Sequence, residues 1–429
     1  MMLMESKARA LAASNKDDGN LLLPDDMMWL IMLRCPVKSI FRFKCVSKTW
    51  HRSLSDPSFR EAYISFRKAK ESQVPPPPLL GFFNFMWNLG KVRIPNPEPQ
   101  GFSFLPTSTE GEPLTRLDFV DRVGSFISIS NGLVLCGDYP NFHVFNPVTR
   151  QLFSLPPSPF HFESIKDSFG IFIYEAATPG FVSSECDNDF KVIVPIVDRR
   201  HVYRQKFMLF WIYFSETGLW KELVLVAPDC FQVFPGVLCT SIGGTVFWYA
   251  SAGGVGCHLL AYDPDGAEDR VQLINLPKVR CITNRHPTLC QSSDGFLQCN
   301  MDTHELPGFR VYALANKLAT YGYDDVVSSK EWILIYDVRL DMLDAIWTGW
   351  LQRCRHRQHD RYVVRMAYHP LNPLILFFRM GHRIYCCDVE NGVIDLIPYE
   401  GRHFYANDYF MLRPYVQPYW PPSPLPKGV

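Results

Sequence analysis

The chain has 429 residues, more than one hydrophobic core usually supports, so two folded units are expected. Hydrophobic residues make up 47% and charged residues 20% of the chain, which is typical of a folded protein and excludes a disordered one. The formal net charge of +0 argues against overall electrostatic attraction to nucleic acid.

Cysteines and apolar runs indicate the compartment. The 13 cysteines are scattered and include no CxxC pair, which favours reduced thiols inside the cell over a disulfide framework. Glu5 and Lys7 interrupt what would be the apolar part of a secretory signal. The longest apolar run, 207–214, is too short to cross a bilayer. We expect a soluble intracellular protein of the nucleus or cytoplasm, with no membrane partner.

Residues 1–20 are small and polar and are expected to be disordered. The LPDD sequence at 23–26 then predicts a helix start, because proline suits the first turn and acidic groups complement the helix dipole. Apolar residues follow on nearly every side of this helix up to Leu33. A helix with so little polar surface needs burial on more than one face.

Pro36 interrupts the helical pattern and restarts it, and apolar residues continue to Leu54 at three- to four-residue steps. The Asp56-Pro57 pair ends that stretch and allows another short helix to Phe66. Three or four short helices make a marginal domain alone. A partner that covers the surplus apolar surface would resolve this, so 21–66 is predicted to be a docking module.

This stretch resembles a plant-type F-box over essentially the whole motif, in LPDD at 23–26, LRCPVKSI at 33–40, RFKCVSK at 42–48 before Trp50, and DP before Phe59. Met27 and Cys35 depart from the family's usual residues but stay apolar. The resemblance implies docking to a Skp-type adaptor, which tethers the protein to a cullin-based ubiquitin ligase. The expected adaptor-binding residues, with the last two as core-or-contact positions, are Leu23, Pro24, Met27, Ile31, Leu33, Pro36, Val37, Ile40, Val46 and Trp50.

The same stretch is strongly basic, with ten Lys or Arg residues between Arg34 and Lys70 against two acidic residues, Asp56 and Glu61. Such charge would complement an acidic adaptor or form a solvated face. Phosphate contact is the alternative. Because no helix-turn-helix or RNA-binding signature accompanies the basic run, we expect no nucleic-acid partner.

Residues 67–113 are predicted to be a Pro-rich linker or wrapping segment, with the tract Pro75–Pro78 as a stiff spacer. Residues 417–429 are predicted to be a Pro-rich tail, or a strap on the last part of the body. The body between them, 114–416, is expected to be all-β because aromatic and β-branched residues are frequent in it.

A weak repeat runs through this body: a turn pair followed by an apolar strand, starting near Gly132, Gly244, Gly295 and Pro373. The wide gaps suggest further starts near Asp189 and Lys330. About six units of forty to fifty residues predict a kelch-like β-propeller. The region resembles the F-box-associated region of plant F-box proteins in the segments SNGL, FNPVTRQ, FSETGLWKEL and HPLNPLILFF.

Catalytic and metal-binding signals are weak. Cys354, His356 and His359 have a superficial metal-ligand spacing, but the arginines around them would repel a cation, so an exposed basic loop is preferred. No Gly-rich phosphate loop, GxSxG or HExxH motif occurs. His143 and His369 are expected to be structural. We therefore expect no catalysis, metal or cofactor in this chain.

No target-binding residue is assigned, because aromatic residues on strands are more often core than surface. The aromatic residues considered for such a face are Phe142, Tyr203, Trp248, Tyr249, Phe309 and Tyr323.

The resemblance implies a non-catalytic substrate-recognition subunit of an SCF-type (Skp–cullin–F-box) ubiquitin ligase. One alternative is an adaptor-binding scaffold that delivers no target, and deletion of the F-box would then stabilise no protein. The other is a propeller that binds a small ligand, which would raise the melting temperature of the body.

Overall fold

The computed structural model divides the chain into two compact units, called here the helical unit (mainly Met1–Pro77 and Pro418–Pro421) and the propeller (mainly Pro78–Gln417). The structure describes residues 25–68, 79–86, 103–106, 124–160, 174–184, 189–198, 205–233, 239–252, 258–266, 269–277, 287–291, 296–302, 308–315, 331–339, 364–369, 372–380, 383–388, 390–397, 410–416, 418–420 and 425.

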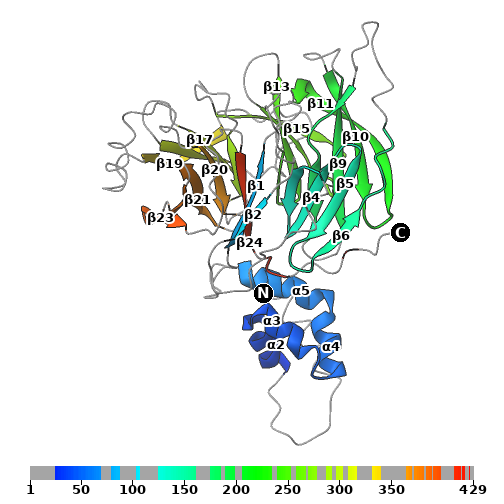
Figure 1. Ribbon diagram of the computed structural model, residues 1–429, viewed down its shortest axis with the longest axis vertical. Helices are drawn as coiled ribbons and strands as arrows, with labels where there is room; N and C mark the ends of the chain where they lie inside the picture. Colours follow the sequence, from blue (N-terminus) through cyan, green and yellow to red (C-terminus); the bar gives the residue numbers. More distant parts are fainter. Residues whose placement is uncertain are drawn as a thin grey trace, which may run out of the picture. The chain divides into compact units, whose positions relative to one another are not determined.

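The helical unit contains four described helices (Figure 1), which are α2 (Asp25–Arg34), α3 (Val37–Phe43), α4 (Lys48–Ser55) and α5 (Pro57–Lys68). The expected breaks at Pro36 and at Asp56-Pro57 are confirmed. A further break, which the spacing did not predict, separates α3 from α4. Ser47 is its cause, since the side chain of Ser47 accepts a hydrogen bond from the Trp50 backbone N–H at 3.1 Å and caps the new helix.

A small aromatic-rich core holds these helices together. Its buried members are Met32, Leu33, Ile40, Leu54, Phe59, Tyr63, Ile64 and Trp420. The Tyr63 hydroxyl also donates a hydrogen bond to the Cys35 carbonyl at 2.9 Å, which ties α5 to the end of α2. Trp420 comes from the C-terminal end of the chain, and among the described residues it is the one buried member of this core outside the four helices.

The propeller is built of antiparallel strands. In chain order they are β1 (Leu79–Met86), β2 (Ser103–Pro106), β3 (Phe126–Ser130), β4 (Leu133–Asp138), β5 (Asn141–Asn146), β6 (Gln151–Ser154), β7 (Tyr174–Ala176), β8 (Gly180–Ser183), β9 (Phe190–Asp198), β10 (Gln205–Phe214), β11 (Leu219–Val233), β12 (Thr240–Ile242), β13 (Thr245–Ala252), β14 (His258–Tyr262), β15 (Val271–Asn275), β16 (Thr288–Gln291), β17 (Leu297–Asp302), β18 (Gly308–Leu314), β19 (Trp332–Arg339), β20 (Val364–His369), β21 (Asn372–Met380), β22 (Arg383–Asp388), β23 (Val393–Ile397) and β24 (Phe410–Val416).

These described strands form the six blades of a β-propeller (Figure 1), as the repeat predicted. The blades are β3–β6, β7–β11, β12–β15, β16–β19, β20–β23, and a sixth made of β2, β1 and β24. The long strand β11 also pairs with β13, so the second and third blades form one continuous sheet. The pairing of β1 with β24 joins the two ends of the propeller and closes the ring.

Six hydrophobic clusters, one between each pair of neighbouring blades, form the propeller core. Because each blade contributes to two clusters, described apolar side chains cover both faces of its sheet. Residues of neighbouring blades that share a cluster are, going round the ring, Phe83 with Phe145, Phe142 with Phe190, Phe210 with Tyr262, Leu259 with Leu297, Phe309 with Phe378, and Phe82 with Phe377.

The repeat signal has a local cause in the hairpin turns. Asn131 and Gly132 have φ of 42° and 80°, and Gly243 and Gly244 have φ of 57° and 88°. Positive φ at both central residues is the requirement of the two-residue type I′ turn. Each pair therefore joins the first two main strands of a blade, β3 to β4 and β12 to β13.

Two expectations about the body differ from the structure. The start proposed near Lys330 is wrong, because β19 is the fourth strand of the blade that begins at β16. Residues 79–106 hold strands β1 and β2 of the closing blade, where irregular wrapping was expected. The partner of β1 is β24, at the far end of the sequence, so no local pattern marks this blade.

The C-terminal segment was expected to be a tail or a strap on the last part of the body, but its described residues pack elsewhere. Trp420 lies in the helical core, with Tyr419 packed against it. Leu425 lies in the cluster between the blades β3–β6 and β7–β11, and its backbone N–H donates a hydrogen bond to Gln151 Oε1 at 3.1 Å.

Candidate docking surface

Helix α2 has two apolar faces, and only one of them packs inside the helical unit. Met28, Trp29, Met32 and Leu33 belong to the helical core. The opposite face carries Met27, Leu30 and Ile31, which are 52%, 48% and 44% exposed. These three positions follow the i, i+3, i+4 spacing of one helical stripe, so they form a continuous apolar surface, called here the α2 outer face.

The residues predicted from sequence for adaptor binding fall into three groups. Met27, Ile31, Pro36 and Val46 are exposed, and Val46 reaches 66%. The half-buried and buried residues, namely Val37, Trp50, Leu33 and Ile40, pack in or against the helical core. Leu23 and Pro24 lie outside the described residues.

Leu30 and Phe41 are two exposed apolar residues that the sequence analysis did not select. Leu30 could have been found from the helical stripe, since it is three residues after Met27 and one before Ile31. The exposure of Phe41 had no such signal. Its ring contacts that of Trp420 at 5.5 Å between centroids and lies under the Lys44 amine at 4.8 Å.

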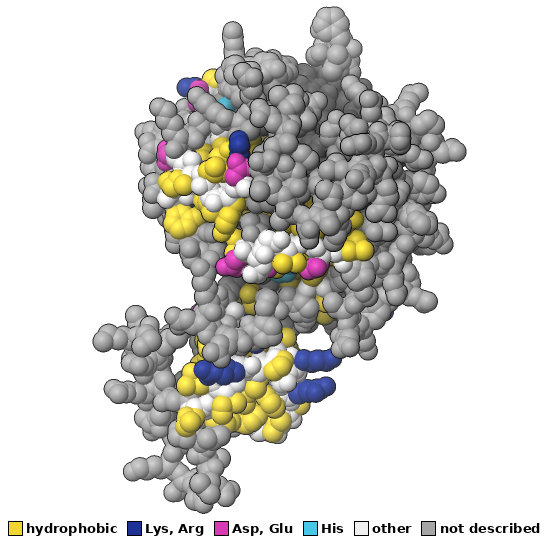
Figure 2. All heavy atoms as spheres, turned by 90° about the vertical axis from the view of Figure 1, so that its left-hand side faces the viewer, with side chains coloured by type: hydrophobic (Ala, Val, Ile, Leu, Met, Phe, Trp, Pro, Cys, Tyr) yellow, Lys and Arg dark blue, Asp and Glu magenta, His cyan; other side chains and the backbone are white. Residues whose placement is uncertain are grey.

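Basic side chains accompany the exposed apolar ones. In Figure 2 hydrophobic and Lys or Arg side chains lie side by side on the helical unit. The described Lys and Arg residues that are exposed on this unit are Arg34, Lys38, Arg42, Lys48 and Arg52. Arg34 donates a hydrogen bond to the Leu30 carbonyl at 3.2 Å, at the end of the α2 outer face. The described surface of the helical unit therefore combines exposed apolar side chains with positive charge.

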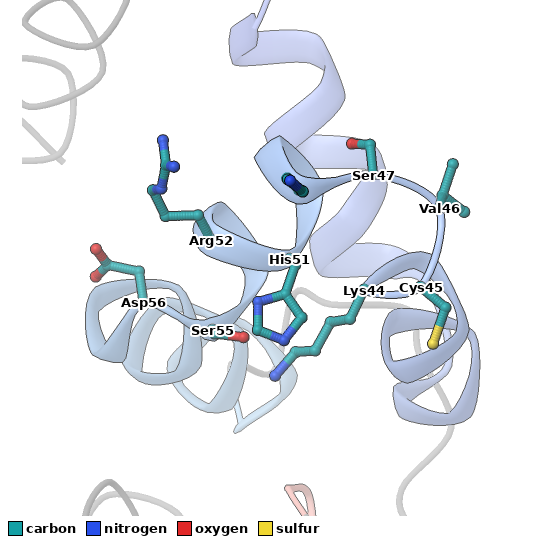
Figure 3. A pocket seen from close by; sticks show the side chains of 9 residues that line it. Lys44, Cys45, Val46, Ser47, His51, Arg52, Ser55 and Asp56 are labelled. Carbon is teal, nitrogen blue, oxygen red and sulfur yellow. The ribbon is translucent and has the colours of Figure 1, made fainter.

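A shallow hollow of about 810 Å³ lies beside the turn between α3 and α4 (Figure 3). It is lined by Lys44, Cys45, Val46, Ser47, Lys48, His51, Arg52, Ser55 and Asp56. Burial, and secondarily the charge of Arg60, lower the pKa of Lys44. Asp56 is engaged locally, because its Oδ1 accepts hydrogen bonds from the backbone N–H and hydroxyl of Ser58 at 2.8 and 2.6 Å.

The histidines and possible metal ligands singled out from the sequence do not come together in a site within the described residues. His143 is half-buried, with its Nδ1 2.9 Å from Ser154 Oγ on the neighbouring strand, whereas His369 is buried beside the Phe377 ring. Among the described residues no group of three or more His, Cys, Asp or Glu side chains is placed to hold a metal ion. The Cys354–His359 stretch lies outside those residues.

Most of the aromatic residues considered for target binding are core residues. Phe142, Trp248, Tyr249 and Phe309 are buried between blades. Trp248 Nε1 donates a hydrogen bond to the Thr178 carbonyl at 2.8 Å, which further fixes it inside the sheet. Tyr203 and Tyr323 lie outside the described residues.

In the part of the chain that is described, no helix is long and apolar enough to span a membrane.

Comparison with known proteins gives the same two-part division. A family model described as "F-box protein At3g26010-like, beta-propeller" matches residues 115–386, and an F-box domain model matches residues 20–62. The chain is 25% identical to F-box protein At5g03970 of Arabidopsis thaliana, over 94% of this chain and 89% of that one. It is 28% identical to F-box protein At5g49610 of the same plant, over 64% and 71%, and 28% identical to F-box protein At3g26010, over 56% and 51%.

Proposed function

Since the chain belongs to the F-box proteins with an At3g26010-like beta-propeller, we propose that it is the substrate-recognition subunit of an SCF-type ubiquitin ligase. The helical unit docks to a Skp-type adaptor, and the propeller binds the target protein. The observation that carries this proposal is the α2 outer face, an apolar surface left exposed on a helix whose opposite face already fills a core.

Burial of this face supplies a driving force of the right size. Each large apolar side chain that leaves water contributes about 1.5–3 kcal/mol in transfer terms, and association costs offset much of the sum. Met27, Leu30 and Ile31, with Val46 beside the basic residues, are therefore sufficient anchors for a specific interface. The basic residues around them favour an acidic adaptor and speed its encounter.

This chain acts as a receptor rather than a catalyst in the proposed complex. Ubiquitin transfer takes place on other subunits. The propeller contributes proximity, because a target held there meets the transfer machinery at a raised effective concentration. The loops that join propeller strands are the general place for such recognition.

The proposal is tested by affinity capture from cells with the proteasome blocked, comparing the whole protein with Ile31→Lys. Ile31 is 44% exposed, so the charge disrupts docking without disturbing the core. The matched control is Ile333→Lys, which changes an exposed isoleucine of β19 in the propeller. We expect adaptor and cullin with the wild type and Ile333→Lys, but not with Ile31→Lys.

Target proteins are expected with all three forms, and they should carry ubiquitin only where the adaptor is present. Adaptor captured equally by Ile31→Lys would refute docking through the α2 outer face. If the wild type captures the adaptor but no protein accumulates in cells that carry Ile31→Lys, the result would instead support a scaffold that delivers no target.

A further inference from the structure

The core of the helical unit is completed by a residue from the opposite end of the chain. Trp420 is 8% exposed and packs among helices that end at Lys68. Its ring lies 5.4 Å from that of Tyr63, 5.5 Å from that of Phe41 and 6.2 Å from that of Phe59, measured between centroids. It therefore contacts α3 and α5 together.

The charged side chain of Lys44 also takes part in this contact. The Lys44 amine lies over the ring of Trp420 at 5.3 Å and over that of Phe41 at 4.8 Å. A cation shared between two aromatic faces stabilises their arrangement beyond the apolar area that they bury. Removing the indole would leave both Lys44 and the end of α3 without this support.

The contacts of Trp420 extend to the helix that carries the docking surface. Phe59, which Trp420 touches, meets Trp29 of α2 edge to face with ring centroids 4.9 Å apart. Trp29 lies on the inner face of α2, and Leu30 and Ile31 follow it on the outer face. Two ring contacts thus connect Trp420 to the inner face of α2, the helix whose other side is the α2 outer face.

In the sequence, Trp420 comes shortly after the strand that closes the propeller. Strand β24, which closes the ring by pairing with β1, ends at Val416, and Trp420 follows four residues later. A chain that ends at Gln417 would keep every described strand of the propeller and lose Trp420.

We propose that Trp420 is a positioning residue for the F-box. It completes the helical core and holds α2 and α3 in the arrangement that the adaptor binds, so docking requires an intact C-terminus. The part of this proposal that concerns the adaptor rests on the proposed function, whereas the part that concerns the helical core does not.

The test uses the full chain with Trp420→Ala and Trp420→Phe. The matched control is Leu425→Ala, which truncates a buried residue of the same C-terminal segment that packs in the propeller. Amide hydrogen exchange is measured for peptides from the helices and from the blades, together with the affinity for a purified Skp-type adaptor.

We expect Trp420→Ala to speed exchange in α3 and α5 by about tenfold or more and to weaken adaptor binding by a similar factor, because truncation of a buried aromatic side chain leaves a large cavity. Trp420→Phe should recover most of both properties. Leu425→Ala should change neither. A synthetic peptide of residues 418–429, added to a chain that ends at Gln417, should restore part of the affinity.

Exchange in the helices of Trp420→Ala equal to that of the wild type would overturn the proposal. Faster exchange with unchanged adaptor affinity would overturn the positioning role and leave the proposed function standing. If the wild type does not bind the adaptor, the proposed function fails, and helix exchange alone then decides whether Trp420 completes the core.

Discussion

The helical unit and the propeller bury their apolar residues in different ways. The propeller closes on itself, so that each blade is covered on both faces by the clusters it shares with its neighbours. The helical unit has a single core and leaves Met27, Leu30 and Ile31 in solvent on the far side of α2. Single strands of the propeller, β11 and β19 among them, also expose apolar side chains, but there the blades cover one another, whereas the outer face of α2 is covered by no described element of its own unit.

The largest effect is expected from a substitution that weakens closure of the propeller ring. Phe83 of β1 is fully buried where the closing blade meets the blade β3–β6, and the rings of Phe104, Phe126, Phe145 and Tyr415 surround it. Phe83→Ala should lower the free energy of unfolding of the propeller by about 3–5 kcal/mol. Urea unfolding followed by tryptophan fluorescence measures this change.

Phe83→Leu, which refills part of the cavity, is the control and should cost much less. A loss below about 1 kcal/mol for Phe83→Ala would mean that the β1–β24 blade contributes little to closure.

Acid should affect the propeller through His369. Burial lowers the pKa of this histidine from 6.5 to about 4. Between these values the unfolded chain binds a proton that the folded chain does not, so stability present above pH 6.5 is lost as the pH falls towards 4. The loss should approach about 3 kcal/mol.

His369→Gln cannot take up this proton and should flatten the pH dependence of the urea midpoint between pH 7 and pH 4.5. The same slope in the variant and the wild type would show that His369 is not the group responsible.

A smaller effect is expected at the start of α4 in the helical unit. Ser47→Ala removes the side chain that accepts the Trp50 N–H and starts α4. The helical unit should lose about 1 kcal/mol of stability, with the propeller unchanged. Hydrogen exchange of α4 amides measures this loss, and Ser47→Asp, which can also cap, should restore protection. Equal exchange in Ser47→Ala and the wild type would contradict the capping role.

The elements that could be predicted from sequence have local causes. Pro36 and the Asp56-Pro57 pair mark helix ends by their own backbone chemistry, and Asn131-Gly132 marks a hairpin because both residues have positive φ. The turn between α3 and α4 was missed because Val46 continues the apolar spacing across it.

The contacts that could not be predicted are long-range. Phe83 of β1 pairs with Arg413 of β24, 330 residues further on, and Trp420 reaches back to helices near the N-terminus. For the docking surface, the apolar pattern of α2 predicted two buried faces but not which one fills the core. That choice is set by the rings of Phe59 and Tyr63 in α5.

The most direct test of the central claim is a calorimetric titration of a purified Skp-type adaptor into the full-length protein and into Ile31→Lys. We expect the wild type to bind with a Kd of about 1 μM or tighter, and Ile31→Lys to bind about 100-fold more weakly with an unchanged melting temperature. Equal affinity of the two forms would contradict the assignment of the α2 outer face as the docking surface.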